Sequence, residues 1–364
     1  MKKKKDIKLI KIHRDNKLFR RKVRSRQKRK AKNKSFLGVN KEGRKQRNAQ
    51  KVFNQRVGTY KQLVAPSNFS LLENTESVIS FINEVDKCYE KKRNLFIDMT
   101  EVERIAYGAI IVLLSKLVHF RARKIEVNGS FPRNKEAKRV LQESGFIDYL
   151  YQNVQIQNEY VINKKICTHA NKVAEPALTA QIIENVSKEL WGTERRCLGV
   201  QRVFLELMQN TNNHASNIQG EKHWWTSFVH VKNDNEDKIC FSFIDYGVGI
   251  FTSLANKKEG KFLGIIDKIK GMFGDVDHAK MLDMLLHGDI HKIANRTKTK
   301  EPFRGKGLPG IFGAMEKNDI SNLQIISNDA YANVAKNKFV NLNNKLEGTY
   351  VYWELNTNNN NLKS

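Results

Sequence analysis

The stretch Ile239–Ile250 reads ICFSFIDYGVGI and decides the fold of the C-terminal half of this 364-residue chain. It opens with an apolar run that predicts a buried strand. Asp245 ends that strand, where its carboxylate is placed to accept a hydrogen bond from an exocyclic amine such as that of adenine. Gly247 and Gly249 follow, and glycine lets the backbone turn and approach a ligand closely. Alone, these residues also fit an ordinary strand-ending turn.

Upstream of this strand, residues 202–215 read RVFLELMQNTNNHA and predict an amphipathic helix. Glu206, Asn210 and His214 recur every fourth residue, so they form a polar stripe beside the apolar face. An amide oxygen suits Mg²⁺, which prefers oxygen ligands, and a carboxylate can activate water near a phosphate. Taken by itself, the stripe also fits a solvated helix face.

Downstream, residues 303–313 read FRGKGLPGIFG, and their glycines lead into a predicted helix from Ile311. The backbone N–H groups of Gly305 and Gly307 would bind phosphate oxygens at the start of a helix. The side chains of Arg304 and Lys306 add positive charge that reaches the same phosphates. Further on, Glu347-Gly348-Thr349 precedes a predicted strand over 350–355, where a threonine hydroxyl would complete an adenine site.

The four pieces follow one another as ExxxNxxxHA, DxGxG, GxGLxG and a GT pair before a strand. This order resembles the N, G1, G2 and G3 boxes of the GHKL superfamily. The superfamily includes gyrase, heat-shock protein 90, sensor histidine kinases, MutL and anti-sigma kinases. The resemblance covers about residues 190–356, and we assign residues 178–356 to this ATP-binding domain.

The resemblance implies a Bergerat-type α/β sandwich, with a mixed sheet covered on one face by helices, and the ligands ATP and Mg²⁺. It makes Asn210 the magnesium ligand, Asp245 the adenine contact and Glu206 the general base. The other predicted nucleotide contacts are Gly247, Gly249, Arg304, Gly305, Lys306, Gly307, Leu308 and Thr349.

The segment between Gly249 and Gly305 is long for a nucleotide lid and includes a predicted apolar helix over 279–286. Long lids often move when nucleotide binds. The histidines of this segment, His278 and His287 among them, have the spacing of solvated or helix-end residues rather than of a metal site. Upstream of Glu206 there is no helix pair that carries a phospho-acceptor histidine, which disfavours a sensor histidine kinase.

Residues 68–165 alternate predicted strands and helices, which indicates a small α/β domain with parallel strands. The strand and turn from Leu95 to Ile110, and a later VLQESGFI at 140–147, resemble the STAS domain of anti-sigma-factor antagonists and sulfate transporters. In the antagonists, the turn before the central helix carries a phosphorylated serine. Here that turn, Arg104–Gly108, has no serine or threonine, so the resemblance favours docking to a protein partner over regulation by phosphorylation.

Residues 1–62 form a basic arm with 25 lysines and arginines against three acidic residues, which accounts for +22 of the net charge of +27. Few of its residues are apolar, so we expect disorder until it meets a polyanion. Such charge density favours binding to RNA or DNA phosphates through counterion release. A solubilising extension is the alternative interpretation.

No apolar run reaches the length of a membrane-spanning helix. We expect no secretory signal peptide, because the sequence is charged from Lys2 onward with no apolar segment behind it. The four cysteines are scattered without CxxC spacing, which is typical of reduced thiols in a cytoplasmic protein. The asparagine-rich tail, 357–364, is expected to fray.

Three functions follow from these features. The first is a slow ATPase that acts as a nucleotide-dependent conformational switch for a protein or nucleic-acid partner. The second is a protein Ser/Thr kinase like the anti-sigma factors, and the third is a non-enzymatic nucleic-acid-binding module that keeps ATP as a ligand. The sequence leaves the oligomeric state open, with a dimer among the alternatives.

Overall fold

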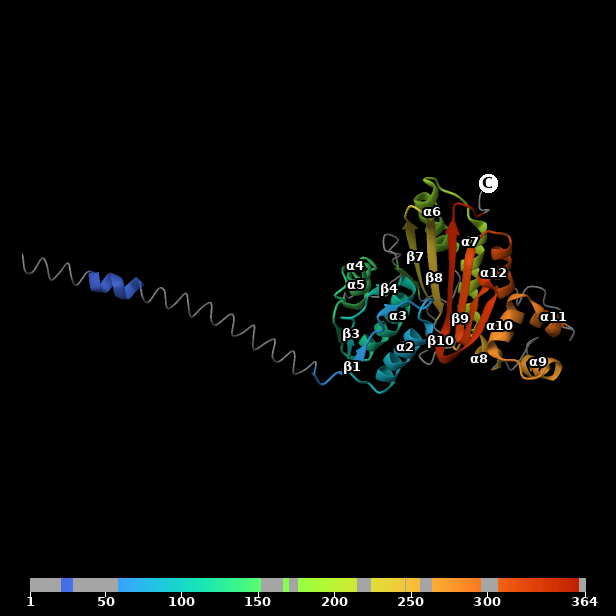
Figure 1. Cartoon of the computed structure of the whole chain (residues 1–364), viewed down its shortest axis with the longest axis horizontal. Coiled ribbons are helices and arrows are strands. Elements are labelled where there is room, and N and C mark those ends of the chain that lie inside the picture. The colour runs from blue at the N-terminus through green and yellow to red at the C-terminus, as the bar shows by residue number, and fades with distance from the viewer. Residues whose placement is uncertain are drawn as a thin grey trace, which may run out of the picture. The chain divides into compact units, whose positions relative to one another are not determined.

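A parallel three-stranded sheet and an antiparallel five-stranded sheet, with a further two-stranded pair, organise the described part of residues 61–364 (Figure 1). The computed structural model describes residues 21–28, 58–151, 166–169, 176–214, 224–245, 247–255, 264–295 and 307–359. The chain divides into two compact units, 1–60 and 61–364. In the first unit, residues 21–28 are helical and carry mostly exposed side chains.

The smaller sheet is parallel, as the alternation of strands and helices predicted, and its strand order is β1-β3-β5. Strand β1 was not predicted, because it begins at Lys61, within the segment expected to be a disordered arm. Strands β2 and β4, which alternate with these strands along the chain, form a separate short parallel pair. We call residues 61–151 the N-terminal layer. Its elements are β1 (Lys61–Val64), β2 (Asn68–Phe69), α2 (Thr75–Glu90), β3 (Leu95–Asp98), β4 (Arg104–Ile105), α3 (Tyr107–Ala122), β5 (Val127–Gly129), α4 (Lys135–Glu143) and α5 (Phe146–Tyr151).

The larger sheet has the strand order β6-β7-β8-β10-β9. Every pairing between these strands is antiparallel, so the predicted mixed sheet is wrong for the strands that the structure describes. The reason is local: β7 and β8, and likewise β9 and β10, are chain neighbours that pair as hairpins. The strands are β6 (Ile166–His169), β7 (Trp224–Lys232), β8 (Asp237–Asp245), β9 (Ser321–Asn333) and β10 (Lys338–Asn356).

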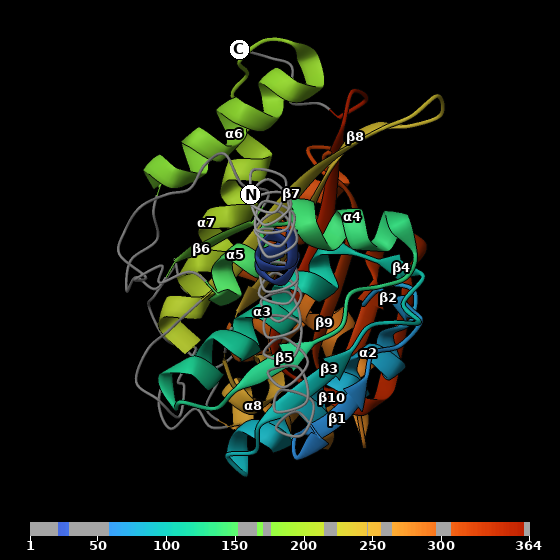
Figure 2. The same ribbon diagram turned by 90° about the vertical axis from the view of Figure 1, so that its left-hand side faces the viewer.

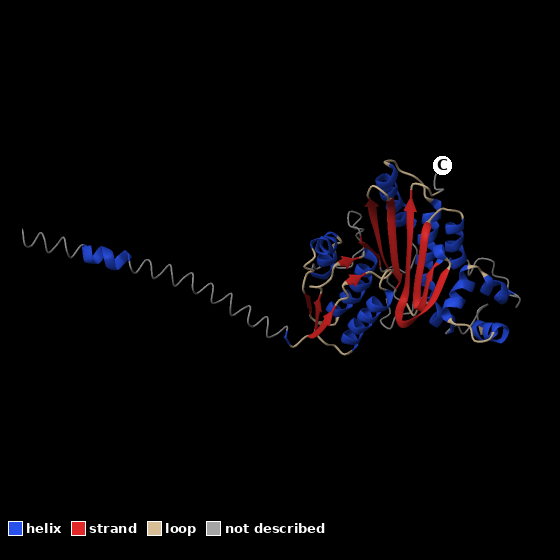
Figure 3. Cartoon of the chain, in the orientation of Figure 1, coloured by secondary structure: helices blue, strands red, loops and turns tan. Residues whose placement is uncertain are grey.

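Helices cover one face of the larger sheet (Figure 3). Phe204 of α7 meets Phe241 of β8 and Trp353 of β10 at ring-centroid distances of 5.6 and 5.0 Å, and these rings form the centre of the core. The helices are α6 (Pro176–Trp191), α7 (Leu198–His214), α8 (Ile250–Ala255), α9 (Ile265–Phe273), α10 (His278–Leu286), α11 (Asp289–Asn295) and α12 (Gly307–Glu316).

The opposite face of the larger sheet is covered by the N-terminal layer, from whose side Figure 2 views the molecule. Trp225, Ile244, Ile326 and Tyr350 share a buried cluster with the side chains of α2 and α3. The expectation that helices cover a single face is therefore wrong. Because strand residues alternate between faces, β7, β8, β9 and β10 each supply side chains to both cores. This also explains why α3 carries apolar side chains on more than one face, since it lies between the two sheets.

Three boundaries differ from the sequence-based expectation. Glu347–Thr349 lies inside β10 rather than before a strand, because the ladder continues through a register shift between Leu346 and Thr349. Helix α12 begins at Gly307, four residues earlier than expected. The tail does not fray at Asn359, which is 1% exposed and whose amide donates to the Asn318 carbonyl oxygen at 3.1 Å. Among the described helices, none is long and apolar enough to cross a membrane.

Candidate functional site

Asp245 occupies the end of β8, in register with Trp224 on β7 and Thr349 on β10. The backbone N–H of Thr349 donates to its Oδ1 at 2.9 Å, and the backbone of Gly247 donates a second hydrogen bond. Burial nevertheless raises the pKa of Asp245 to about 7. The carboxylate is thus held in a fixed orientation while its charged form remains short of stabilising partners.

Two glycines beside Asp245 have backbone conformations that other residues rarely adopt. Gly348 has φ +94°, and a Cβ there would lie 2.1 Å from the carbonyl oxygen of Asp245. Gly249 has φ +78°, and a Cβ there would lie 2.4 Å from Oδ1 of Asn328. Both distances are shorter than van der Waals contact, so the turn after Asp245 and the strand opposite it each require glycine.

Ser327 and Asn328 of β9 hold this turn, and sequence reasoning missed both. Ser327 Oγ accepts a hydrogen bond from the first backbone N–H of α8 at 2.9 Å and lies 3.0 Å from Oγ1 of Thr349. Asn328 accepts from the second backbone N–H of α8 at 3.1 Å and donates to the carbonyl oxygen of Val248 at 2.9 Å. The signal was present as a polar Ser-Asn-Asp triplet directly after the apolar pair Ile325-Ile326.

A second cluster forms where α12 packs against α7. A Cβ on Gly307 would lie 3.0 Å from Nδ2 of Asn210, and one on Gly310 would lie 3.1 Å from the guanidinium of Arg202. Glu206 lies between Arg202 and Asn210 on the same stripe of α7. The start of α12 therefore lies against Asn210, one member of the polar stripe that the sequence predicted to face a pocket.

A shallow groove of about 260 Å³ follows this stripe, and Glu206 is half-buried within it. The groove is lined by Leu198, Gln201, Arg202, Leu205, Glu206 and Gln209.

The predicted site residues thus fall into two described groups. One joins Asp245, Gly247 and Thr349 by hydrogen bonds, with Gly249 in the following turn. The other places Asn210 against Gly307, and Leu308 is partly buried against the core beside it. Both groups adjoin the face of the larger sheet that the helices cover, since α7, α8 and α12 all pack there. Arg304, Gly305 and Lys306 lie outside the described residues.

The segment expected to form a lid is partly built into the core. Helix α10 buries six side chains, and its first residue, His278, donates or accepts a hydrogen bond with Asp329 of β9. The His278 ring also stacks on Phe251 of α8 at 4.2 Å, and the backbone N–H of Ala279 donates to Asn341 at 2.9 Å. Two histidines of this segment have described side chains, His278 and His287, and they lie at the start and the end of α10. Helix-end positions are what their spacing suggested.

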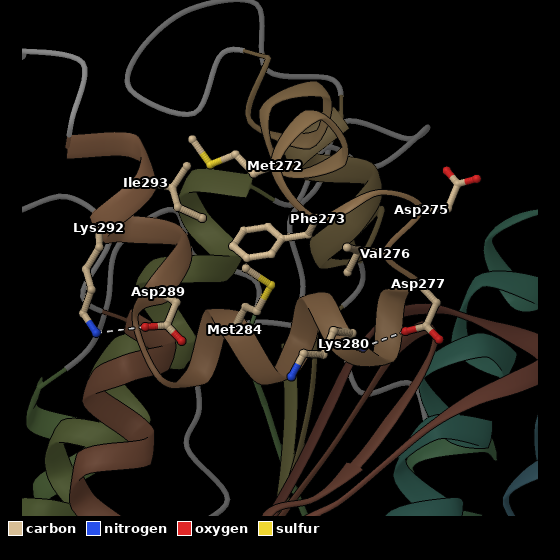
Figure 4. Close-up of a pocket in the computed structure, with 10 residues that line it drawn as sticks. All are labelled: Met272, Phe273, Asp275, Val276, Asp277, Lys280, Met284, Asp289, Lys292 and Ile293. Carbon is tan, nitrogen blue, oxygen red and sulfur yellow. Dashed lines mark hydrogen bonds and ion pairs between the residues drawn. The ribbon is translucent and has the colours of Figure 1, made fainter.

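A larger groove of about 740 Å³ lies among α9, α10 and α11 (Figure 4). Its wall includes Met272 and Phe273, which are 54% and 59% exposed. Lys292 pairs with Asp289 at 2.8 Å at its edge. The described lining residues include none of the predicted nucleotide contacts. They are Met272, Phe273, Asp275, Val276, Asp277, Lys280, Met284, Asp289, Lys292 and Ile293.

Comparison of the chain with known protein families, curated proteins and solved structures finds no match. A functional assignment is therefore argued from the geometry of Asp245, Asn210 and their neighbours.

Proposed function

We propose that residues 178–356 bind Mg-ATP in the manner of the GHKL superfamily. The observation that carries the proposal is Asp245, an oriented carboxylate at a strand end, with a glycine-dependent turn after it and a glycine-dependent position in the strand opposite it. An exocyclic adenine amine would donate to this carboxylate, which lacks enough partners of its own. Thr349 and Ser327, whose hydroxyls lie 3.0 Å apart, would border the same base.

The phosphates would lie at the start of α12, against Asn210. The first backbone N–H groups of a helix have no partner within the helix and attract anions. Gly307 leaves no side chain between these groups and the Asn210 amide. The donor set suits Mg²⁺, because Asn210 supplies an amide oxygen and this ion commonly takes its other ligands from phosphates and water. Bound there, the ion would neutralise phosphate charge.

Glu206 is our candidate for the general base of slow ATP hydrolysis. It is one helical turn from Asn210 and half-buried in the groove along α7. Its carboxylate would take a proton from water as the water oxygen bonds to the γ-phosphorus and the bond to the ADP oxygen breaks. The chemistry would be slow and would serve to reset a conformational switch for a protein or nucleic-acid partner.

The kinase alternative keeps the same nucleotide site but needs an acceptor hydroxyl. The STAS-like turn, residues 104–108, has no serine or threonine to serve as that acceptor, and its Gly108 packs against Tyr350 of the larger sheet. The non-enzymatic alternative differs only in turnover. In both the switch and the non-enzymatic reading, the basic arm is the proposed contact with nucleic acid.

The proposal is tested by calorimetric titration of ATP with Mg²⁺ into the wild type, Asp245→Asn and Asn210→Ala. Phosphate release from the wild type and Glu206→Ala is measured beside it. Glu101→Ala, an exposed residue that pairs with Arg133 at 2.8 Å, serves as the control. We expect saturable binding that both site variants weaken at least about tenfold, and turnover that Glu206→Ala abolishes while binding survives. Equal binding by Asp245→Asn and the wild type would refute the assignment of the site.

Binding without turnover, in wild type and Glu206→Ala alike, would instead favour the non-enzymatic module. Transfer of the γ-phosphate to a protein would favour the kinase.

A further inference from the structure

Helix α3 of the N-terminal layer carries a buried lysine in an otherwise apolar environment. Lys116 has a side chain 5% exposed, and its Nζ lies 2.6 Å from Oδ2 of Asp86 on α2. A buried ammonium is unfavourable unless it is paired and hydrogen-bonded. Asp86 supplies one partner from within the same layer, so the position of the ammonium is fixed there.

The same ammonium reaches the larger sheet. Oε2 of Glu347 lies 3.1 Å from Nζ of Lys116. Glu347 belongs to β10 and comes two residues before Thr349, whose backbone N–H donates to Asp245. Between them stands Gly348, the residue whose φ of +94° brings the strand against the carbonyl oxygen of Asp245. The ion pair between Lys116 and Glu347 thus lies next to the Thr349 N–H, which orients Asp245, the candidate adenine contact.

The other end of α3 touches the far side of Thr349. A Cβ on Gly108 would lie only 2.1 Å from the hydroxyl of Tyr350, so helix and ring are in close contact. Tyr350 is 1% exposed, and its hydroxyl lies 3.0 Å from Oγ of Ser242. The Tyr350 hydroxyl is therefore held between Gly108 of α3 and the Ser242 hydroxyl of β8. Helix α3 therefore contacts the residues on both sides of Thr349, through Lys116 with Glu347 and through Gly108 with Tyr350.

We infer that Lys116 and Gly108 are positioning residues for the nucleotide site, which hold Glu347–Tyr350 so that the Thr349 N–H stays directed at Asp245. The inference rests on the proposed function, because it concerns the same carboxylate. The N-terminal layer then sets the affinity of the site for nucleotide. By reciprocity, nucleotide bound at Asp245 stabilises the packing of α3.

The test uses Glu347→Ala, because Glu347 is 65% exposed and its loss leaves the buried Lys116–Asp86 pair intact. The matched control is Glu101→Ala, whose side chain is 70% exposed and forms an ion pair of similar length within the N-terminal layer. Glu347→Gln keeps an acceptor oxygen for Lys116. Gly108→Ala perturbs the second contact independently.

Two measurements are made on the full chain: amide hydrogen exchange without ligand, and ATP affinity. We expect Glu347→Ala and Gly108→Ala to accelerate exchange at residues 348–350 and to weaken ATP binding about five- to tenfold. Glu347→Gln should keep most of the affinity, and Glu101→Ala should change neither quantity. In the wild type, ATP should slow exchange in α3, and this protection should be lost in Glu347→Ala.

Unchanged exchange at residues 348–350 in both Glu347→Ala and Gly108→Ala would overturn the inference. So would ATP affinities within twofold of the wild type. If the wild type binds no ATP, the proposed function fails, but the exchange measurement still decides whether the N-terminal layer orders the Thr349 amide.

Discussion

Replacing Asp245 by asparagine should make the protein more stable while it loses nucleotide. Burial raises the pKa of Asp245 from its ordinary value near 3.8 to about 7. That rise corresponds to a penalty of about 4 kcal/mol on the charged form in the folded state. Asparagine has nearly the same shape and no charge. The asparagine variant loses about 1 kcal/mol where its amide N–H₂ group faces a backbone N–H donor, so we expect a net gain of about 3 kcal/mol above pH 8.

The pH dependence distinguishes this cause from a general change in packing. Between about pH 4 and pH 7, the folded wild type keeps a proton on Asp245 that the unfolded chain has lost, so wild-type stability falls as pH rises through this range. The asparagine variant lacks this titration. Asp86, whose pKa burial raises to about 6, has an effect of the same sign, but it is present in both proteins and cancels in the difference.

The assay is urea denaturation of the wild type and Asp245→Asn at intervals from pH 5 to pH 8.5, with ATP titration at each pH. The stability difference should grow up to about pH 7 and then level off, and wild-type affinity for ATP should rise over the same interval as the carboxylate ionises. A variant that is less stable than the wild type by an amount independent of pH would refute the reasoning.

Three further predictions concern the turn, the core and the arm. Gly249→Ala should cost about 2 kcal/mol or more, since the residue has φ +78° and its Cβ would meet Asn328, and ATP titration should show weakened binding. Phe204→Ala removes a ring that packs on Phe241 and Trp353 and should cost about 3–5 kcal/mol by urea denaturation; a loss below 1 kcal/mol would contradict the core described here. Deleting residues 1–57 should abolish a steeply salt-dependent binding to RNA or DNA, measured by fluorescence anisotropy, and leave ATP affinity unchanged; retained binding would place the contact elsewhere.

The sequence predicted the helices of the N-terminal layer well, because their signals are local. Apolar residues recur with helical spacing from Val78 to Val85, and Asn134 caps α4 by accepting from the backbone N–H groups of Glu136 and Ala137. The parallel pairing of β3 and β5 also followed from local alternation, whereas β1 begins at Lys61, inside the segment expected to be the basic arm. Such patterns depend on residues a few positions apart, which a single sequence contains in full.

The layer arrangement was not predictable in the same way. That α3 lies between two sheets depends on contacts such as Gly108 with Tyr350, which are distant in the chain. Likewise, Thr349 was placed beside adenine by motif order, whereas its hydrogen bond to Asp245 depends on the register of β8 and β10. Asn328 could not be predicted, because its side chain hydrogen-bonds the backbone of a segment distant in the chain. Such a role produces no periodic pattern in the sequence.

Because both faces of the larger sheet are covered, we expect the N-terminal layer and the larger sheet to evolve together as one folding unit. A fragment that began at residue 166 would expose the aromatic and aliphatic side chains of Trp225, Ile244, Ile326 and Tyr350 to water, and such a surface aggregates. Neither layer can be exchanged for a relative's without its counterpart, because each presents side chains shaped to the other. A change at Gly108 must be accommodated at Tyr350, so the two positions should vary together among descendants of this chain.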